Sequence, residues 1–229
     1  MTVNGLRKLT LLDFPGRVAC TLFLAGCNMR CPFCHNAPLV IDGSGVENIP
    51  EDELLAFLKK RSGVLDGVCI TGGEPTLRRE LPELLRSIKA LGYAVKLDTN
   101  GTNPHILASL IDEGLVDYVA MDIKNSPEKY SLTAGRHVDM DAVRRSVSIL
   151  MENKVKYEFR TTVVGGYHTA DDFRAIGEWL RGAEAYFLQN FVDSGALLDP
   201  ETRGADESEM KEYLEIMKQF VPAAELRGM

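Results

Sequence analysis

Three cysteines lie within eight consecutive positions of the chain, at Cys27, Cys31 and Cys34. Thiolates at such short intervals typically hold iron–sulfur clusters, and a cubane cluster usually takes four of them, one for each iron. If these three bind a four-iron cluster, one iron keeps an open position for a small molecule, as a catalytic zinc does. The alternative is a zinc site that adds His35, although adjacent residues such as Cys34 and His35 rarely reach one tetrahedral metal without strain.

Polar residues stand at the ends of three predicted strands. They are Gly72, Gly73 and Glu74 after the second strand, Asp98, Thr99 and Asn100 at the end of the third, and Asp122 and Lys124 at the end of the fourth. The set suits a zwitterionic ligand, because a carboxylate needs a cation, an ammonium needs an anion, and ribose hydroxyls take carboxylate or amide partners. Two glycines also let the backbone approach a ligand closely. The alternatives are a tight turn at the glycines and helix capping by Asn100.

These residues must be positioned by βα units, because short β-rich runs alternate with helical patterns along the chain. The predicted strands span residues 17–24, 67–71, 94–98, 118–123, 156–164 and 186–191. Several are apolar without alternation, as expected for parallel strands covered on both faces. Helical stripes between them, such as Leu81, Leu84 and Ile88, predict core packing, and a last helix is expected over residues 205–220.

Six parallel strands in about 200 residues fall short of a closed eightfold barrel, which typically takes about 250 residues. The expected fold class is therefore α/β, an incomplete open parallel (β/α)6-type partial TIM barrel with a C-terminal helix. We expect it to form a single domain over residues 1–229. Chemistry in such architectures sits at the carboxyl ends of the strands, which is where the polar residues stand.

Composition narrows the class of protein. The chain has 26 Lys and Arg against 33 Asp and Glu, a net charge of −7, so no nucleic-acid partner is expected. The longest uncharged apolar stretch, residues 18–27, is about half of what a membrane-spanning helix requires, so no membrane association is expected. With clustered cysteines and no targeting segment, we expect a cytoplasmic protein. Cys20 and Cys69 lie in apolar runs and are expected to be small buried core residues.

The cysteine loop, residues 25–36, resembles the cysteine motif of the radical S-adenosylmethionine superfamily. The resemblance implies a [4Fe–4S] cluster on Cys27, Cys31 and Cys34. It also implies that the amino and carboxylate groups of S-adenosylmethionine chelate the open iron. No cysteine follows Cys69 in the sequence, so only one cluster is expected.

Two further features agree with this family. The stretch Gly72-Gly73-Glu74-Pro75 is similar to the motif that receives the methionyl amino group, which implies that contact for Gly72, Gly73 and Glu74. Phe33 is similar to the aromatic residue that lies near the adenine; otherwise it packs under the loop.

Other stretches resemble one branch of the family, the glycyl-radical-enzyme activases. Residues 12–17 and the pair His35-Asn36 are similar to the anaerobic ribonucleotide-reductase activating proteins, and residues 98–101 and 122–124 to the activases in general. The resemblance implies cofactor contacts from Asp98, Asn100, Lys124 and Arg160, and a monovalent cation on Asp98, Thr99 and Asp122. For Arg160, a surface salt bridge is the alternative.

The activity implied by this resemblance is the reductive cleavage of S-adenosylmethionine to methionine and a 5′-deoxyadenosyl radical, which takes a hydrogen from a glycine of a partner enzyme. The expected partner is an anaerobic ribonucleotide reductase, with pyruvate formate-lyase or another glycyl radical enzyme as the alternative. The expected electron donor is of the flavodoxin or ferredoxin type. No catalytic side chain beyond the cluster and the cofactor is needed, because the cofactor supplies the radical chemistry.

Two other classes of function stay open. A small-molecule radical S-adenosylmethionine enzyme would share every cofactor residue and differ in a pocket lined for its substrate. A zinc or electron-transfer module would share only the cysteines.

Overall fold

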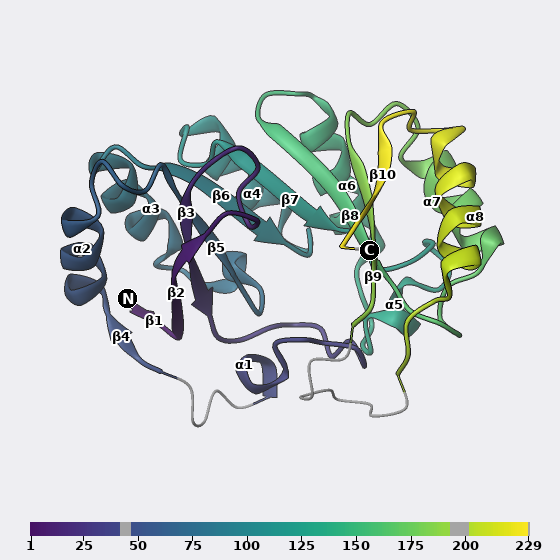
Figure 1. Ribbon diagram of the computed structural model, residues 1–229, viewed down its shortest axis with the longest axis horizontal. Coiled ribbons are helices and arrows are strands. Elements are labelled where there is room, and N and C mark those ends of the chain that lie inside the picture. The colour runs from purple at the N-terminus through teal and green to yellow at the C-terminus, as the bar shows by residue number, and fades with distance from the viewer. Residues whose placement is uncertain (42–46, 193–201, 229) are drawn as a thin grey trace.

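Strands and helices alternate along the chain in the computed structural model, which describes residues 1–41, 47–192 and 202–228 (Figure 1). The strands are β1 (Thr2–Val3), β2 (Gly5–Thr10), β3 (Ala19–Leu24), β4 (Ile49–Pro50), β5 (Gly67–Gly72), β6 (Ala94–Thr99), β7 (Tyr118–Asp122), β8 (Lys156–Val163), β9 (Tyr186–Asn190) and β10 (Ala224–Arg227). The helices are α1 (Ala37–Ile41), α2 (Glu51–Lys60), α3 (Leu81–Ala90), α4 (Pro104–Asp112), α5 (Tyr130–Thr133), α6 (Met140–Met151), α7 (Ala170–Trp179) and α8 (Glu207–Lys218), with a short 3₁₀ helix η1 (Pro75–Leu77).

The main sheet is a curved, mostly parallel sheet with the strand order β10-β9-β8-β7-β6-β5-β3-β2. Only β2 runs antiparallel to its neighbour, β3, while the pairs from β3 to β10 are parallel. Among the described residues, β2 and β10 form the two edges of this sheet and do not pair with each other. The predicted fold class, an incomplete open parallel barrel, is therefore confirmed.

All six predicted strands are present, and the structure adds strands at both edges of the sheet. β2 was missed because Arg7 and Lys8 interrupt its apolar pattern, and β10 because it has only four residues. Short, charged edge strands are common in natural sheets, since they resist pairing with other chains. The expected C-terminal helix is α8, which begins with a capping box between Asp206 and Glu209.

Alternate residues of the central strands face two different environments. In β6, Val95 and Leu97 are fully buried in the main apolar cluster, which the helices cover. The residues between and after them, Lys96 and Asp98, lie on the other face and form an ion pair. Because side chains alternate along a strand, this pattern places charged groups inside the barrel and apolar groups under the helices. Cys20 and Cys69 are buried, as predicted.

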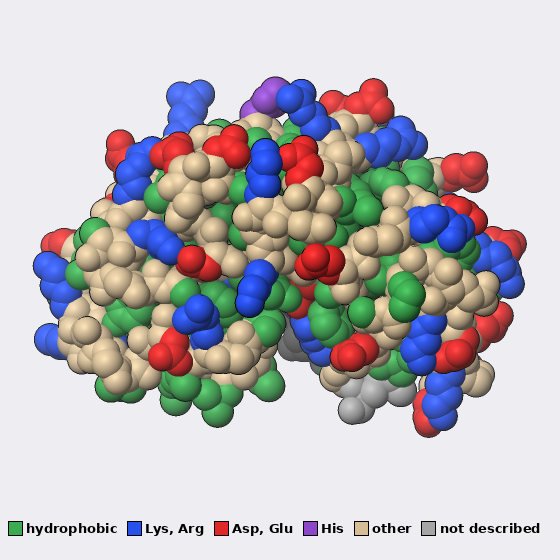
Figure 2. All heavy atoms as spheres, turned by 90° about the horizontal axis from the view of Figure 1, so that it is seen from above, with side chains coloured by type: hydrophobic (Ala, Val, Ile, Leu, Met, Phe, Trp, Pro, Cys, Tyr) green, Lys and Arg blue, Asp and Glu red, His purple; other side chains and the backbone are tan. Residues whose placement is uncertain are grey.

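The molecular surface carries charges of both signs. Figure 2 shows Lys and Arg side chains intermingled with Asp and Glu side chains over the face seen from above in Figure 1. In the part of the chain that the structure describes, no helix combines the length and the apolar character needed to cross a membrane.

Candidate cofactor-binding site

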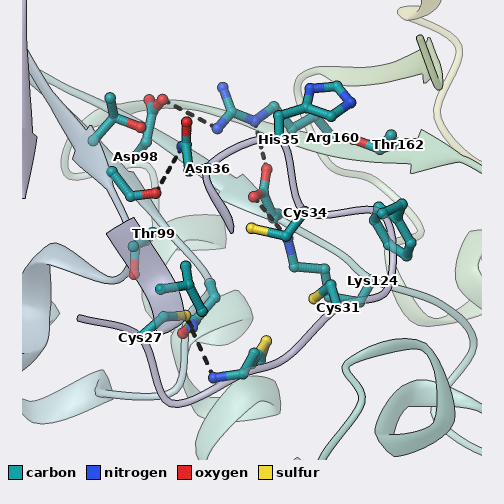
Figure 3. A pocket seen from close by; sticks show the side chains of 18 of the residues that line it. Cys27, Cys31, Cys34, His35, Asn36, Asp98, Thr99, Lys124, Arg160 and Thr162 are labelled. Atoms are coloured by element: carbon teal, nitrogen blue, oxygen red, sulfur yellow. Dashed lines mark hydrogen bonds and ion pairs between the residues drawn. The ribbon is translucent and has the colours of Figure 1, made fainter. Parts of the chain in front are cut away.

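A pocket of about 280 Å³ lies at the carboxyl ends of the parallel strands, beside the loop between β3 and α1 (Figure 3). Its lining comprises Cys27, Met29, Cys31, Phe33, Cys34, His35, Asn36 and Val40 from the cysteine loop and α1, Thr71, Gly72 and Gly73 from the end of β5, and Asp98, Thr99, Asn100, Asp122, Lys124, Arg160, Thr162 and Gln189 from the following strands. Most of the predicted site residues therefore meet in one place.

The cysteine loop is held by its own backbone and by one arginine. The Cys34 amide donates to the Cys31 carbonyl at 3.0 Å, and the Gly26 amide donates to the Leu39 carbonyl at 2.9 Å. Arg30 folds back on the loop and donates from Nη1 to the carbonyls of Cys27 and Met29, at 2.8 and 2.7 Å. These bonds satisfy the carbonyls of Cys27, Met29 and Cys31, and the thiols of the loop line the pocket.

The three thiols fit an iron–sulfur cluster. All of them are free rather than in disulfides, and their side chains lie around the same space as Lys124 (Figure 3). Burial raises the pKa of each thiol, to about 11 for Cys31, so binding of a metal must displace protons. In the described residues, no three His, Cys, Asp or Glu side chains converge on a point suited to a single metal ion. A cubane cluster instead takes thiolates spread around a larger body.

The end of β5 lies directly against the cysteine loop because it is made of glycine. Gly72 has φ +124°, and a Cβ there would lie 2.3 Å from the Leu24 carbonyl oxygen. A Cβ on Gly73 would lie 2.0 Å from the carbonyl oxygen of Gly26. Asn36 completes the junction by donating from Nδ2 to the Gly72 carbonyl at 2.8 Å. From the sequence, Asn36 was identified only as part of a family signature, and its position close to the last cysteine was the available signal.

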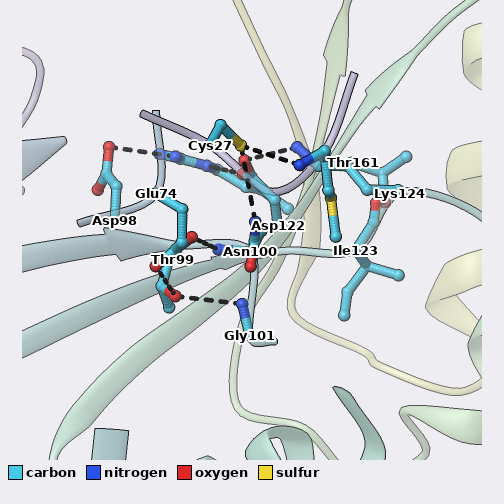
Figure 4. Close-up of polar contacts among 12 residues, drawn as sticks. Cys27, Glu74, Asp98, Thr99, Asn100, Gly101, Asp122, Ile123, Lys124 and Thr161 are labelled. Atoms are coloured by element: carbon cyan, nitrogen blue, oxygen red, sulfur yellow. Dashed lines mark hydrogen bonds and ion pairs between the residues drawn. The ribbon is translucent and has the colours of Figure 1, made fainter. Parts of the chain in front are cut away.

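Glu74 lies beside the pocket rather than in its lining. Its side chain is fully buried and accepts from the Thr76 amide and hydroxyl at 3.0 and 2.6 Å. It also accepts from the Thr99 hydroxyl at 2.9 Å and from the Asn100 amide at 2.6 Å (Figure 4). Burial raises the pKa of this carboxyl, and the hydrogen bonds oppose the rise. Glu74 thus joins the ends of β5 and β6, and its contact with a methionyl amino group stays a prediction.

Asn100 connects β6 to the cysteine loop. Its Nδ2 donates to Asn28 Oδ1 at 2.9 Å and lies 4.0 Å from the Cys27 sulfur. Asn28 in turn donates from Nδ2 to the Thr102 hydroxyl at 2.8 Å. The helix-capping alternative does not describe this residue, since the N-cap position of α4 is Asn103.

Oppositely charged side chains from β6, β8 and the end of β7 form a series of ion pairs at the pocket. Asp98 pairs with Lys96 and with Arg160 Nη2, the latter at 3.1 Å. Arg160 Nε also pairs with Asp122 at 2.5 Å, and Asp122 pairs with Lys124 Nζ at 2.9 Å. Arg160 is only 17% exposed, so it is part of the pocket and not a surface salt bridge.

These pairs control the charge states of the residues. Burial alone would raise the pKa values of Asp98 and Asp122, but the neighbouring Arg160, with Lys96 and Lys124, holds both below their usual value. The carboxylates in turn raise the pKa values of Lys124 and Arg160, against the effect of burial. Asp98, Asp122, Lys124 and Arg160 are therefore ionised at neutral pH.

The predicted monovalent-cation residues have other partners in this structure. Asp98 and Asp122 are paired with Lys and Arg side chains, as above. The Thr99 hydroxyl donates to Glu74 and accepts from the Gly101 amide at 3.1 Å (Figure 4). The cation site stays a prediction.

His168 supports the backbone of Lys124, and the sequence analysis missed it. The ring is buried, its Nε2 lies 2.8 Å from the Lys124 carbonyl oxygen, and its Nδ1 accepts from the Val164 amide at 3.1 Å. These contacts fix the neutral tautomer with hydrogen on Nε2, and burial lowers the pKa of the ring. No local pattern signals this role, because His168 lies more than forty residues from its partner.

The last strands contribute residues that the sequence analysis did not assign. Thr162, two positions after Arg160 on β8, and Gln189 on β9 both line the pocket. Alternation along β8 was the signal for Thr162. Asn190 points elsewhere, since its Oδ1 accepts from the Ala205 amide at 3.0 Å. Phe33 is buried at the pocket wall, with its ring edge-on to Tyr167 at a centroid distance of 6.3 Å.

Comparisons with known proteins show similarities of sequence and of fold. A family model described as the radical SAM superfamily matches residues 21–180. A protein of Methanocaldococcus jannaschii, provisionally named a glycyl-radical enzyme activating enzyme, is 32% identical over 236 aligned positions that cover 98% of this chain and 95% of that protein. A protein of Pyrococcus horikoshii, provisionally named a GTP 3′,8-cyclase, is 30% identical over 141 positions that cover 60% of this chain and 44% of that protein. A radical SAM methyltransferase from Sphaerobacter thermophilus shares the fold, with a TM-score of 0.71 at 16% identity over 96% of this chain and 68% of that chain.

Proposed function

Because the chain belongs to the radical S-adenosylmethionine superfamily, we propose that it is an activase that generates a glycyl radical on a partner enzyme, an anaerobic ribonucleotide reductase. The family uses a [4Fe–4S] cluster and S-adenosylmethionine, and the cysteines of its motif are present as Cys27, Cys31 and Cys34. When bound, these cofactors supply a 5′-deoxyadenosyl radical, the species that takes a hydrogen atom from the partner's glycine.

One observation favours an activase over other functions within this family. The relative named as a glycyl-radical enzyme activating enzyme aligns with almost the whole of both chains, 98% of this one and 95% of its own. The relative named as a GTP cyclase aligns over 44% of its own length, so most of that protein has no counterpart in the alignment. A shared cofactor-binding core accounts for the similarity to the relative named as a GTP cyclase. The alignment over almost the whole of both chains supports a function like that of the relative named as an activating enzyme.

In this proposal, the residues of this chain have distinct roles in holding the cofactor. The three thiols would bind the cluster, and Lys124 and Arg160 would pair with the cofactor carboxylate, because charge-assisted hydrogen bonds are the strong ones. The backbone at Gly72 and Gly73 would receive the amino group. Asp98 and Asn100 would face the ribose, and Phe33 the adenine, with Glu74 and Asn36 holding the strand ends in place.

The proposal is tested with the full chain, reconstituted anaerobically with iron and sulfide and reduced with dithionite. We expect 5′-deoxyadenosine and methionine from S-adenosylmethionine, and a glycine-centred doublet by electron paramagnetic resonance when an anaerobic ribonucleotide reductase is present. Cys31→Ala should abolish both signals. Cys20→Ala is the matched control, since Cys20 is a buried thiol outside the pocket, and it should retain both.

The remaining outcomes separate the rival functions. A doublet with pyruvate formate-lyase and none with the reductase would keep the activase role and replace the partner. Deoxyadenosine that forms without a doublet on any glycyl radical enzyme, and faster when GTP is added, would overturn the proposal in favour of a small-molecule enzyme. A colourless protein that holds zinc would overturn it altogether.

A further inference from the structure

The charges of the ion-paired residues at the pocket do not balance among themselves. Two carboxylates, Asp98 and Asp122, face three cationic side chains, Lys96, Arg160 and Lys124. The five groups together therefore carry one net positive charge. Such an excess suits a pocket that receives a carboxylate, because a buried anion is stable only where a cation compensates it.

Lys96 provides the excess positive charge from outside the pocket lining. Its side chain is 3% exposed, and Nζ donates to Asp98 Oδ1. It is not in the pocket lining, whereas Asp98, Arg160 and Lys124 are. Lys96 thus compensates the charge of Asp98 from outside the pocket lining, and Arg160 and Lys124 are left to face a ligand.

A further carboxylate near Lys96 is Glu158, which already has partners. Glu158, two positions before Arg160 on β8, is fully buried and accepts two hydrogen bonds from the Arg227 guanidinium, at 2.6 and 2.9 Å. It also accepts from the Tyr118 hydroxyl at 2.8 Å. Because Arg227 compensates Glu158, the charge of Lys96 remains available to Asp98.

We propose that the Lys96 ammonium is a built-in counterion that takes the place of a bound monovalent cation beside Asp98. The sequence analysis predicted such an ion on Asp98, Thr99 and Asp122. In the structure, Lys96 and Arg160 lie at Asp98, Arg160 and Lys124 lie at Asp122, and the Thr99 hydroxyl bonds Glu74. The inference rests on the cofactor placement proposed above, and is independent of the identity of the protein partner.

A tethered cation has a physical advantage over one from solution. It is held next to its carboxylate by the chain, so its occupancy does not depend on the salt concentration, just as linking two groups replaces a bimolecular encounter by an intramolecular one. Among the described residues, removing it would leave the partly buried Asp98 with Arg160 as its remaining cationic partner, and Arg160 is shared with Asp122. A small cation from solution could then enter the space vacated by the ammonium.

The first test measures the affinity for S-adenosylmethionine in NaCl, KCl and choline chloride at equal ionic strength, with the full chain reconstituted anaerobically. Choline is too large to replace an ammonium group. We expect the dissociation constant of the unchanged protein to vary by less than about twofold among the three salts. Lys96→Met keeps the length of the side chain and removes its charge, so its affinity should fall about tenfold in choline chloride, with partial recovery in NaCl or KCl.

The second test needs neither cluster nor cofactor. We expect the thermal midpoint of the cluster-free full chain to be the same in the three salts, and that of Lys96→Met to be lower in choline chloride than in NaCl or KCl. The double variant K96M/D98N removes one charge of each sign and should lose the salt dependence. Lys89→Met, which breaks the Lys89–Asp117 pair at 2.8 Å outside the pocket, is the control and should show none.

The outcomes are decisive in either direction. A saturable requirement of the unchanged protein for Na⁺ or K⁺, in either test, would overturn the proposal, and so would a Lys96→Met protein that behaves alike in all salts. If Lys96→Met does not fold, Lys96→Gln and the salt dependence of the unchanged protein still decide. If no salt supports S-adenosylmethionine binding, the cofactor placement fails, while the thermal midpoints continue to test Lys96.

Discussion

At the scale of single residues, the site depends on the close approach between the backbone of the cysteine loop and the backbone at the end of β5. The cysteine loop and the end of β5 are joined by the Gly73 amide donating to the Leu24 carbonyl and the Glu74 amide donating to the Gly26 carbonyl, each at 2.8 Å. Any side chain at Gly73 would enter this junction. Gly72 and Gly73 are therefore required by packing, in addition to any contact that they make with a ligand.

This dependence predicts that Gly73→Ala disrupts cluster loading. The added Cβ would lie 2.0 Å from the Gly26 carbonyl oxygen and 3.2 Å from the Cys27 Cβ, so the cysteine loop must move away from β5. We expect a loss of about 1–3 kcal/mol in the free energy of unfolding, the usual range for overpacking. We also expect iron bound per chain, measured after anaerobic reconstitution, to fall well below that of the unchanged protein.

Gly92→Ala separates this steric effect from the general effect of replacing glycine. Gly92 has φ +87° and has no atom within 4 Å of an added Cβ, so its replacement strains only the local backbone. It should retain full iron content despite some loss of stability. Equal iron content in both variants would show that the close approach at Gly73 does not support the cysteine loop.

At the scale of elements, the alternation of strands and helices was sufficient to predict the parallel sheet and the place of the site. The six strands with apolar runs were all found, because buried parallel strands carry a strong local signal. β2 and β10 were missed, since an edge strand is stabilised by a neighbour that the local sequence does not show. The sequence therefore predicted the centre of the sheet better than its edges.

The candidate site shows the same division between local and non-local information. The cysteines, Gly73 and Lys124 stand in recognisable local patterns, and the structure brings them to one pocket. The buried network of Glu74 and the support from His168 involve partners far along the chain. Such roles could not be predicted, because a residue's hydrogen-bond partners depend on which elements pack together.

One such non-local contact connects α7 to the segment that follows Lys124. Asp172, in the first turn of α7, accepts from the Ser126 hydroxyl at 2.8 Å and from Lys129 Nζ at 2.7 Å. It also forms the capping box of the helix with Thr169. The same carboxylate therefore starts the helix and anchors the chain after β7.

We expect Asp172→Asn to lower the free energy of unfolding by about 1–3 kcal/mol at pH 7, measured by urea denaturation. Burial alone would raise the pKa of Asp172, but hydrogen bonds from Lys129, Thr169 and Ser126 hold it below its usual value. A native pKa below the unfolded one stabilises the fold above about pH 4, and this stabilisation is lost as the pH falls through the native pKa. The difference between the two proteins should thus be constant from pH 7 to 5 and shrink below about pH 4.

Asp171→Asn is the matched control for this pH dependence. Asp171 is the preceding residue and its side chain is 92% exposed, where it pairs with Arg174 on the same helix. Exposed pairs contribute little, so this change should stay within about 0.5 kcal/mol at every pH. An effect of Asp172→Asn that does not vary with pH would mean that its charge is not what anchors the segment.

At the scale of the whole molecule, the open sheet has an ionic interior that extends from the pocket to the C-terminal strand. Arg227 on β10 reaches across to Glu158 on β8, and its guanidinium lies 3.6 Å from the centre of the Phe187 ring on β9. An incomplete barrel has no closing pair of strands to fix its last strand. The pair between Arg227 and Glu158 supplies a side-chain contact that spans the last three strands of the sheet.

Arg227 connects the edge strand β10 to the interior of the sheet, so its removal should destabilise both. Arg227→Met would leave the fully buried Glu158 with Tyr118 as its remaining hydrogen-bond donor, so we expect a loss of about 2–4 kcal/mol in the free energy of unfolding. Because Glu158→Gln removes the charge that Arg227 compensates, the double variant R227M/E158Q should be clearly more stable than the sum of the single effects predicts. Hydrogen exchange should show faster opening of β10 in Arg227→Met, while the exposed Arg174→Met should resemble the unchanged protein. Strict additivity of the two single effects would mean that β10 is held by its backbone pairing with β9 alone.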